Sequence, residues 1–215
     1  FRLPKRDQGG EALRGVVAAG SMMVMIDRND YRQCASIFPQ GMADALRTDG
    51  LEAMRARIAR SAPDLGPLDT LLTDMSQFFL LSVALDRLDR WDRPGLLAIG
   101  DAAHAMSPIG GIGINLAIQD AVAAANILAA PLRRSSNADD LLFRVERRRR
   151  LPARVIQAGQ KRAQDRIIGA IFKPGAQIDR PPWVLRLLNR FPLLRRIPGR
   201  IVGLGVRRER VESPR

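Results

Sequence analysis

Residues 96–120 read LLAIGDAAHAMSPIGGIGINLAIQD, and this stretch constrains the fold more than any other part of the chain. It begins with a short apolar run, continues through a Gly-Asp pair, and then contains the only histidine of the protein. A proline and three glycines follow within six residues, and a helix-like spacing of apolar side chains starts after them. This succession predicts a buried strand, a loop and a helix, with the loop as the candidate site.

The residue types in this loop suit a ligand. Gly100 allows an unusual backbone angle or a close approach, and Asp101 follows at the carboxyl end of the strand, where α/β folds bring ligand groups. Pro108 stiffens the loop, and the glycines after it clear side chains away from backbone N–H groups. The helix beginning near Gly113 points its free N–H groups toward the same place. These groups suit sugar hydroxyls and a phosphate or a carbonyl edge, and a glycine-rich turn without a ligand is the alternative.

The segments on either side predict an α+β or α/β fold. The expected strands lie at residues 15–26, 31–38, 76–88 and 96–100, and the expected helices at residues 42–61, 114–128, 138–170 and, as short pieces, 182–206. Gly50 weakens the first helix, Pro131 is expected to end the second, and Pro152 is expected to kink the third. We therefore divide the chain into a sheet region with one helix (1–90), a strand–loop–helix unit (91–132) and a helical region (133–215).

Composition indicates a chain with a core and a strongly uneven charge. The 215 residues are 46% hydrophobic and include one cysteine, Cys34, so no disulfide can form within the chain. The net charge is +13, and residues 133–215 hold 22 Lys/Arg against 7 Asp/Glu, which is +15 for that region alone. We interpret this excess as arginine on solvated helix faces, with an anionic partner as the alternative.

The opening stretch resembles the second FAD-binding motif of the class A flavoprotein monooxygenases, the para-hydroxybenzoate hydroxylase-like family. The segments around it, RWDRPGLLAIGDAAH and MVMIDRNDYRQCASIFPQG, resemble the lead-in strand and the substrate-side sheet of that family. The resemblance covers essentially the whole chain and corresponds to the C-terminal half of the family. The matching positions are Gly100, Asp101, Ala102, Ala103, His104, Pro108, Gly110, Gly113, Asn115 and Asp120.

The resemblance implies a role for each site residue. Asp101 would hydrogen-bond the ribityl chain of FAD, and the loop after Pro108 would pass beside the isoalloxazine ring. The amides of Gly113, Ile114 and Asn115 would face the pyrimidine edge of the ring, where negative charge develops. The full set of expected cofactor-binding residues is Gly100, Asp101, Ala102, Pro108, Gly110, Gly111, Gly113, Ile114 and Asn115.

The activity implied by the resemblance is that of an FAD-dependent oxidoreductase of the monooxygenase type. It would hydroxylate a small organic substrate, for example an aromatic one, through a flavin C4a-peroxide, with NAD(P)H as the reductant. Tyr31 and Gln33, with Arg32 between them, lie on a strand of the substrate-side sheet and are candidates for lining the substrate pocket. An ordinary sheet face is the alternative for these residues.

The chain departs from the family in lacking the other half of the cofactor site. Residues 1–95 contain no GxGxxG segment, which in the family follows the first strand and holds the ADP pyrophosphate. We do not identify the family's central Asp-Gly motif either, and the first residues, FRLPKRDQGG, resemble the interior of a longer protein. The expected architecture is therefore a truncated flavoprotein hydroxylase fold that, by itself, binds FAD weakly or not at all. A missing N-terminal segment or separate chain is the expected partner.

The sequence fits a metal site and a catalytic triad less well than a flavin site. A metal site is disfavoured because His104 and Cys34 are the only residues of their types. A catalytic triad of Ser107, His104 and Asp101 is disfavoured because these residues are too close in sequence and no nucleophile elbow is present. We expect His104 to shape the loop and Asp120 to cap or pack within its helix.

The basic C-terminal region offers a second class of function. Residues 183–211 mix arginine with large apolar residues, which suits either peripheral contact with a membrane or helices packed on the domain. A non-catalytic module that docks on a membrane or a partner is therefore the alternative function. Nucleic acid is not expected, because aromatic residues are 5% of the chain and no recognition motif is present. We expect no transmembrane helix, and a cytoplasmic or membrane-peripheral location.

Overall fold

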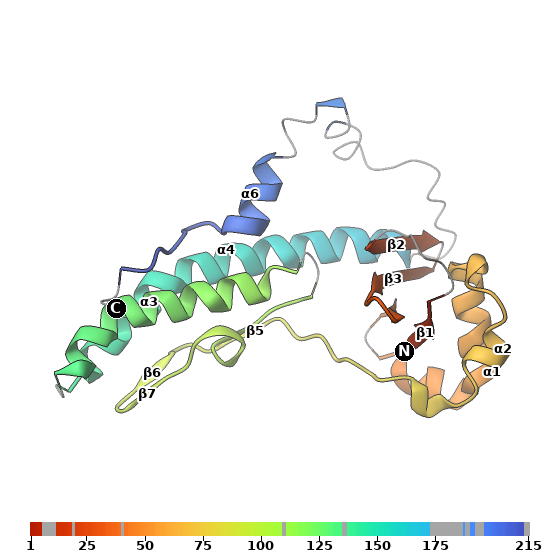
Figure 1. The fold of residues 1–215 in the computed structure, drawn as a ribbon, viewed down its shortest axis with the longest axis horizontal. Coiled ribbons are helices and arrows are strands. Elements are labelled where there is room, and N and C mark those ends of the chain that lie inside the picture. Colours follow the sequence, from red (N-terminus) through yellow and green to blue (C-terminus); the bar gives the residue numbers. More distant parts are fainter. Residues whose placement is uncertain are drawn as a thin grey trace. The chain divides into compact units, whose positions relative to one another are not determined.

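The structure is a computed structural model that describes residues 1–5, 12–18, 20–39, 41–108, 111–134, 137–172, 187, 190, 191 and 196–212. Its contacts divide the chain into two compact units (Figure 1). Unit 1 is Phe1–Ser82 with Arg166–Arg180, and unit 2 is Val83–Asp165 with Pro181–Arg215. Strands and helices occur in both units, so the expected mixed α/β class is confirmed.

Unit 1 is built on a four-stranded antiparallel sheet with the order β1-β4-β3-β2. Its strands are β1 (Arg2–Pro4), β2 (Leu13–Ala18), β3 (Ser21–Asp27) and β4 (Tyr31–Ile37). The expected single strand over 15–26 is wrong, because Gly20 adopts a φ of 69° and turns the chain back between β2 and β3. The expected turn before Tyr31 is present, with Asn29 at a φ of 66° and its N–H donated to Asp27.

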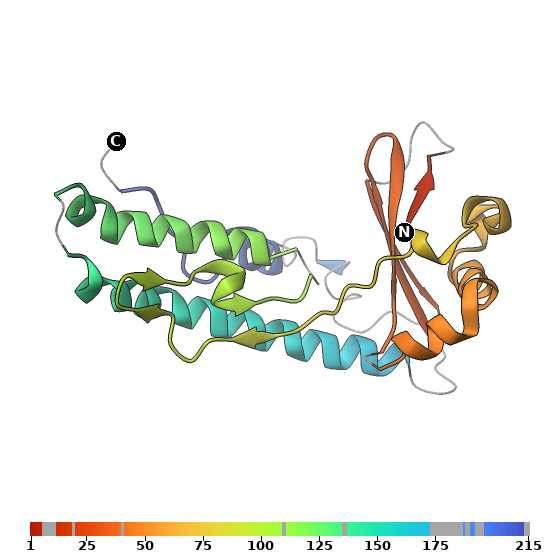
Figure 2. The same ribbon diagram turned by 90° about the horizontal axis from the view of Figure 1, so that it is seen from below.

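The helices of unit 1 cover one face of this sheet (Figure 2). Helix α1 (Ala43–Ser61) is broken at Gly50, where φ is 80°, and α2 (Leu68–Leu71) follows a short 3₁₀ turn. The shared core contains Met23, Met25 and Cys34 of the sheet and Met54 and Ile58 of α1. Burial raises the pKa of the Cys34 thiol to about 11, which is typical of an inert core thiol.

The segment from residue 76 to residue 88 differs from the expected strand. Residues 75–77 form a 3₁₀ turn, and only Asp86–Arg87 (β5) pair with another strand, β8 (His104–Ala105). Between them the chain is extended, and the side chains of Phe79 and Leu81 are 77% and 80% exposed. Phe78 packs against the core of unit 1, with its ring centroid 5.3 Å from that of Phe1. The exposed residues 79–84 that follow pair with no strand among the described residues.

Unit 2 is organised around two long helices, α3 (Gly113–Arg133) and the part of α4 (Asp139–Ile171) up to Asp165, which lie side by side in Figures 1 and 2. A hairpin of β6 (Asp92–Arg93) and β7 (Leu96–Leu97), a 3₁₀ turn (Gly100–Ala102) and β8 complete the described part of the motif. The short helix α6 (Arg196–Leu204) precedes a C-terminal segment.

Three expectations for unit 2 need correction. The strand over 96–100 is reduced to two residues, and Leu96 is 62% exposed, because the described residues offer β7 only the two-residue partner β6. Pro131 lies inside α3, and Pro152 lies inside a continuous α4. A proline inside a helix removes one N–H···O=C hydrogen bond, and Pro131 does so with only Leu132 and Arg133 left before α3 ends.

Helix α3 is long and apolar enough to cross a membrane when judged by length and composition alone. The apolar helices of soluble cores pass the same test, and α3 carries the candidate site at its N-terminus and a buried aspartate in its middle. The range 183–211, which we considered for membrane contact, is described only at residues 187, 190, 191 and 196–211.

Candidate functional site

The turn at Gly100 requires glycine for two reasons. Its φ is 58°, which side-chain-bearing residues rarely adopt, and a Cβ built on it would lie 2.9 Å from the Cβ of Ala117 in α3. The absence of a side chain at Gly100 therefore allows the backbone of the turn to pack in direct contact with α3. This close packing determines where the next residue, Asp101, projects.

Asp101 and Ala102 are exposed at the surface of this turn. Asp101 makes no hydrogen bond or ion pair with the other described residues, so its carboxylate can accept hydrogen bonds from a ligand. Asp101 lies in the 3₁₀ turn rather than directly at a strand end, because β7 stops three residues before Gly100. The turn, rather than the end of the strand, therefore positions Asp101.

The loop after the turn leads into the N-terminus of α3. Pro108 is exposed, and Gly111 has a φ of 62° with open space where a Cβ would be. Gly110 lies outside the described residues. Helix α3 begins at Gly113 and no side chain caps it. The first-turn N–H groups of an α-helix have no intrahelical acceptor, so this end can donate to an electron-rich ligand.

The first turn of α3 contains the remaining expected site residues. Ile114 is 70% exposed, and Asn115 is half-buried. Gly113 packs against Met106, with 3.4 Å between a built Cβ and the Cβ of that residue. The structure thus brings the described site residues to one edge of unit 2, formed by the turn, the loop and the helix end.

Beneath this edge lies a buried charge network that sequence reasoning missed. Asp120 is fully buried, and its Oδ2 accepts the Gly100 N–H at 3.1 Å and lies 2.5 Å from His104 Nε2. Its Oδ1 accepts from Arg149 Nε of α4 at 2.8 Å, and the Arg149 side chain is also fully buried. Asp120 therefore does not cap the helix but ties the Gly100 turn, His104 and α4 together.

The network continues into the C-terminal segment, residues 205–212. Arg149 Nη1 donates to the Arg207 carbonyl at 2.8 Å and to Glu209 at 3.4 Å. The Glu209 side chain is fully buried, and its carboxylate accepts a hydrogen bond from Arg148 at 2.7 Å. This hydrogen bond is the main cause that raises the pKa of the Arg148 guanidinium. Arg148 and Arg149, which belong to the run RRRR at residues 147–150, thus face two buried carboxylates.

A signal for this network was present in the sequence. Buried side chains of α4 recur at Leu142, Val145, Arg149, Ala153 and Ile156, with the spacing of one helix face. An arginine within such an apolar stripe requires a buried acid as its partner. In the structure that acid is Asp120, the one acidic residue of α3.

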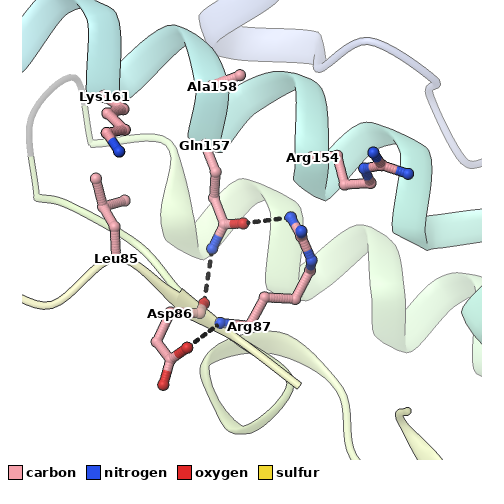
Figure 3. Close-up of a pocket in the computed structure, with 7 residues that line it drawn as sticks. All are labelled: Leu85, Asp86, Arg87, Arg154, Gln157, Ala158 and Lys161. Atoms are coloured by element: carbon pink, nitrogen blue, oxygen red, sulfur yellow. Dashed lines mark hydrogen bonds between the residues drawn. The ribbon is translucent and has the colours of Figure 1, made fainter. Parts of the chain in front are cut away.

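Gln157 of α4 anchors the β5–β8 ladder from a pocket of about 420 Å³ (Figure 3). Its Nε2 donates to the carbonyls of Asp86 at 2.7 Å and Ala105 at 3.0 Å, and its Oε1 accepts from Arg87 at 2.9 Å. The Gln157 side chain therefore holds the strand that carries His104 against α4. The pocket is also lined by Leu85, Arg154, Ala158 and Lys161.

The geometry bears on the two disfavoured alternatives, a catalytic triad and a metal site. His104 Nε2 pairs with Asp120 rather than with Asp101, so the Ser107, His104 and Asp101 grouping does not form. Within the described residues, no group of three or more His, Cys, Asp or Glu side chains could hold a metal ion.

The candidate substrate residues lie on β4 of unit 1. Tyr31 is half-buried, and the guanidinium of Arg2 lies over its ring, 4.9 Å from the ring centroid. Gln33 is exposed and accepts from Arg28 at 3.0 Å. Arg32 is half-buried between them. These contacts are those of an ordinary sheet face, and the assignment to a substrate pocket stays a prediction.

Comparisons with known proteins agree with the motif. Residues 11–159 match the protein family described as FAD binding domain. The enzyme 6-methylpretetramide 4-monooxygenase of Streptomyces rimosus is 35% identical over 169 residues, which make up 75% of this chain and 40% of that protein.

Solved structures give the same result. PqsL of Pseudomonas aeruginosa, described as a probable FAD-dependent monooxygenase and solved with 2-aminobenzoylacetate, is 25% identical with a TM-score of 0.62. That match covers 80% of this chain and 47% of PqsL. The rebeccamycin biosynthetic enzyme RebC, solved with reduced flavin, shares the fold at 18% identity and a TM-score of 0.59, over 94% of this chain and 39% of RebC. The chain thus spans less than half the length of each of these relatives.

Proposed function

Because this chain belongs to the FAD binding domain family and is homologous to FAD-dependent monooxygenases, we propose that it forms the flavin-ring half of a monooxygenase. The observation that carries this proposal is the edge formed by the Gly100 turn, the exposed Asp101 carboxylate and the uncapped N-terminus of α3. One side offers an acceptor for hydroxyl groups, and the other offers donors for a carbonyl edge.

The chemistry of these groups fits a flavin. Asp101 is the group that would hold the ribityl hydroxyls, and the open space at Gly111 leaves room for a flat ring beside the loop. The N-terminus of α3, at Gly113, Ile114 and Asn115, would favour negative charge on the pyrimidine edge. When bound, the flavin supplies hydride transfer and oxygen activation, and these residues orient it.

We assign an organic, aromatic type of substrate and NAD(P)H as the reductant. The names of the relatives, which include 6-methylpretetramide and 2-aminobenzoylacetate, support the substrate class. A monooxygenase inserts one oxygen atom of O₂ and reduces the other to water, which takes two electrons that the substrate does not supply. A nicotinamide nucleotide is the ordinary source of these electrons for a flavin.

The proposed partner is the half of the protein that binds ADP. The four outward side chains Ile114, Ile118, Ala121 and Ala125 form an exposed apolar stripe along α3. A stripe of this kind on a helix requires a covering layer. Because the match covers 40% of the S. rimosus relative, the part of such a protein outside the match is long enough to supply that layer.

Replacement of Asp101 tests the cofactor assignment. The test uses a completed protein, in which this chain replaces the matched region of the S. rimosus relative. We expect Asp101→Asn to weaken FAD binding by about tenfold to a hundredfold, as measured by flavin fluorescence, because a hydrogen bond to a charged group contributes about 1.5–3 kcal/mol.

Asp140→Asn provides the matched control. Asp140 is an exposed aspartate in the first turn of α4, and its replacement should leave the affinity for FAD unchanged. Equal affinity of the Asp101→Asn and unsubstituted proteins for FAD would refute the assignment of Asp101 to the ribityl chain.

A further inference from the structure

The C-terminal segment, residues 205–212, lies across α3 and α4 and is held by side chains of both helices. Asn126 of α3 donates to the Arg210 carbonyl at 2.7 Å and accepts the Glu212 N–H at 2.8 Å. Arg149 of α4 donates to the Arg207 carbonyl at 2.8 Å. At the start of the segment, a Cβ built on Gly205 would lie 3.0 Å from the Gln119 side chain.

The segment also supplies a buried charge. The carboxylate of Glu209 is fully shielded from solvent, and its partners are Arg148 at 2.7 Å and Arg149 at 3.4 Å. Without Glu209 and the Arg207 carbonyl, the Nη1 of Arg149 would be buried without an acceptor. A buried charge that loses a partner is strongly destabilising, so Arg149 is expected to move when the segment is detached.

Movement of Arg149 would reach the candidate flavin site through one residue. Asp120 is bound to Arg149 through Oδ1 and to the Gly100 N–H and His104 through Oδ2. A single carboxylate therefore links α4 to the turn from which Asp101 projects. All three side chains, those of His104, Asp120 and Arg149, have no exposed area.

We propose that residues 205–212 act as a latch that fixes the Gly100–His104 turn in its flavin-binding shape through Glu209, Arg149 and Asp120. Glu209 and Arg149 are positioning residues in this arrangement, since neither projects from the edge where the flavin would lie. The inference rests on the proposed function only in naming the flavin as the ligand of the turn. The connection from Glu209 to His104 is inferred from the hydrogen bonds alone and does not depend on the identity of the ligand.

His104 is the only histidine of the chain, so the NMR signals of its imidazole ring report the state of the network without ambiguity. We expect Glu209→Gln in the full chain to shift the ring proton and nitrogen signals of His104, although residue 209 is not one of its neighbours. Glu212→Gln is the control, because Glu212 is exposed and its N–H, which the substitution keeps, makes the contact with Asn126. It should leave the His104 signals unchanged.

A second variant protects the test against misfolding. Asn126→Ala removes two hydrogen bonds to the latch and leaves every buried charge paired. It should shift the His104 signals in the same direction by a smaller amount. Unchanged His104 signals in both Glu209→Gln and Asn126→Ala, with the circular dichroism spectrum retained, would overturn the latch.

FAD affinity in the completed protein separates the latch from the proposed function. We expect Glu209→Gln to lower the affinity for FAD about tenfold and Glu212→Gln to have no effect. If the His104 signals shift and the unsubstituted completed protein binds no FAD, the latch is upheld and the proposed function fails. If FAD binds and Glu209→Gln changes neither the affinity nor the His104 signals, the proposed function is upheld and the latch fails.

Discussion

Gly100 shows how a single residue controls the candidate site. Its backbone angle and its contact with Ala117 both exclude a side chain, and either alone would favour glycine. Sequence reasoning predicted the need for close approach or an unusual φ at this position. The structure gives both and identifies the neighbour.

Gly100→Ala is expected to destabilise the protein more than a substitution that only strains the backbone. The positive φ costs about 1–2 kcal/mol, and forcing a methyl group against Ala117 adds about 1–3 kcal/mol. Gly95→Ala is the control, because Gly95 has a φ of 70° and open space around it, so it should lose only the first of these amounts. Urea unfolding of the two variants measures the difference, and equal losses would show that the contact with Ala117 relaxes freely.

The charged residues mark the limit of prediction at the residue scale. Motif spacing pointed to Gly100, Asp101 and the glycines as candidate site residues, because these residues are close together in the sequence. Arg149 and Glu209 are 29 and 89 residues from Asp120 in the sequence, and one chain carries no signal for which buried acid meets which arginine. The sequence shows only that Arg149 lies on an apolar helix face. Its partners could be identified only from the three-dimensional structure.

At the scale of elements, the helices were predicted better than the strands. The spacing of apolar residues gave α1, α3 and α4 to within a few residues, because a helix satisfies its own backbone hydrogen bonds. A strand depends on a partner, so the apolar run at Phe78–Leu81 remains extended and unpaired among the described residues. The two-residue β5 and β7 are similarly limited by what they pair with.

Gln157 is expected to stabilise the short β5–β8 ladder in place of a longer strand. Gln157→Leu would deprive the Asp86 and Ala105 carbonyls of a donor and Arg87 of an acceptor, which should cost about 2–3 kcal/mol. Arg154→Leu, on the exposed side of the same pocket, should change the free energy of unfolding by less than about 0.5 kcal/mol. Thermal unfolding followed by circular dichroism compares the two, and a larger loss for Arg154→Leu would contradict the role of Gln157.

At the scale of the whole molecule, the basic C-terminal region is partly turned inward. Arg148 and Arg149 are paired with Glu209 and Asp120, and Arg150 is paired with Glu146 at 2.8 Å. The RRRR run is therefore a set of internal contacts as well as a source of positive charge. Composition alone gave the size of the charge excess, but it could not distinguish arginines that face buried acids from arginines that face solvent.

The apolar stripe of α3 gives the last prediction, which concerns the two halves of the proposed enzyme. We expect the chain alone to lose FAD during gel filtration and to retain it after mixing with the part of the S. rimosus relative that lies outside the match, because only together would the two parts offer both ends of the cofactor a site. Ile118→Glu should abolish this association, since Ile118 is 56% exposed in the middle of the stripe. Leu151→Glu, at a 59% exposed position on α4, should not. Retention of FAD by the chain alone would show that this half needs no partner to bind the cofactor. Equal effects of the two substitutions would mean that the ADP-binding half does not pack on the stripe.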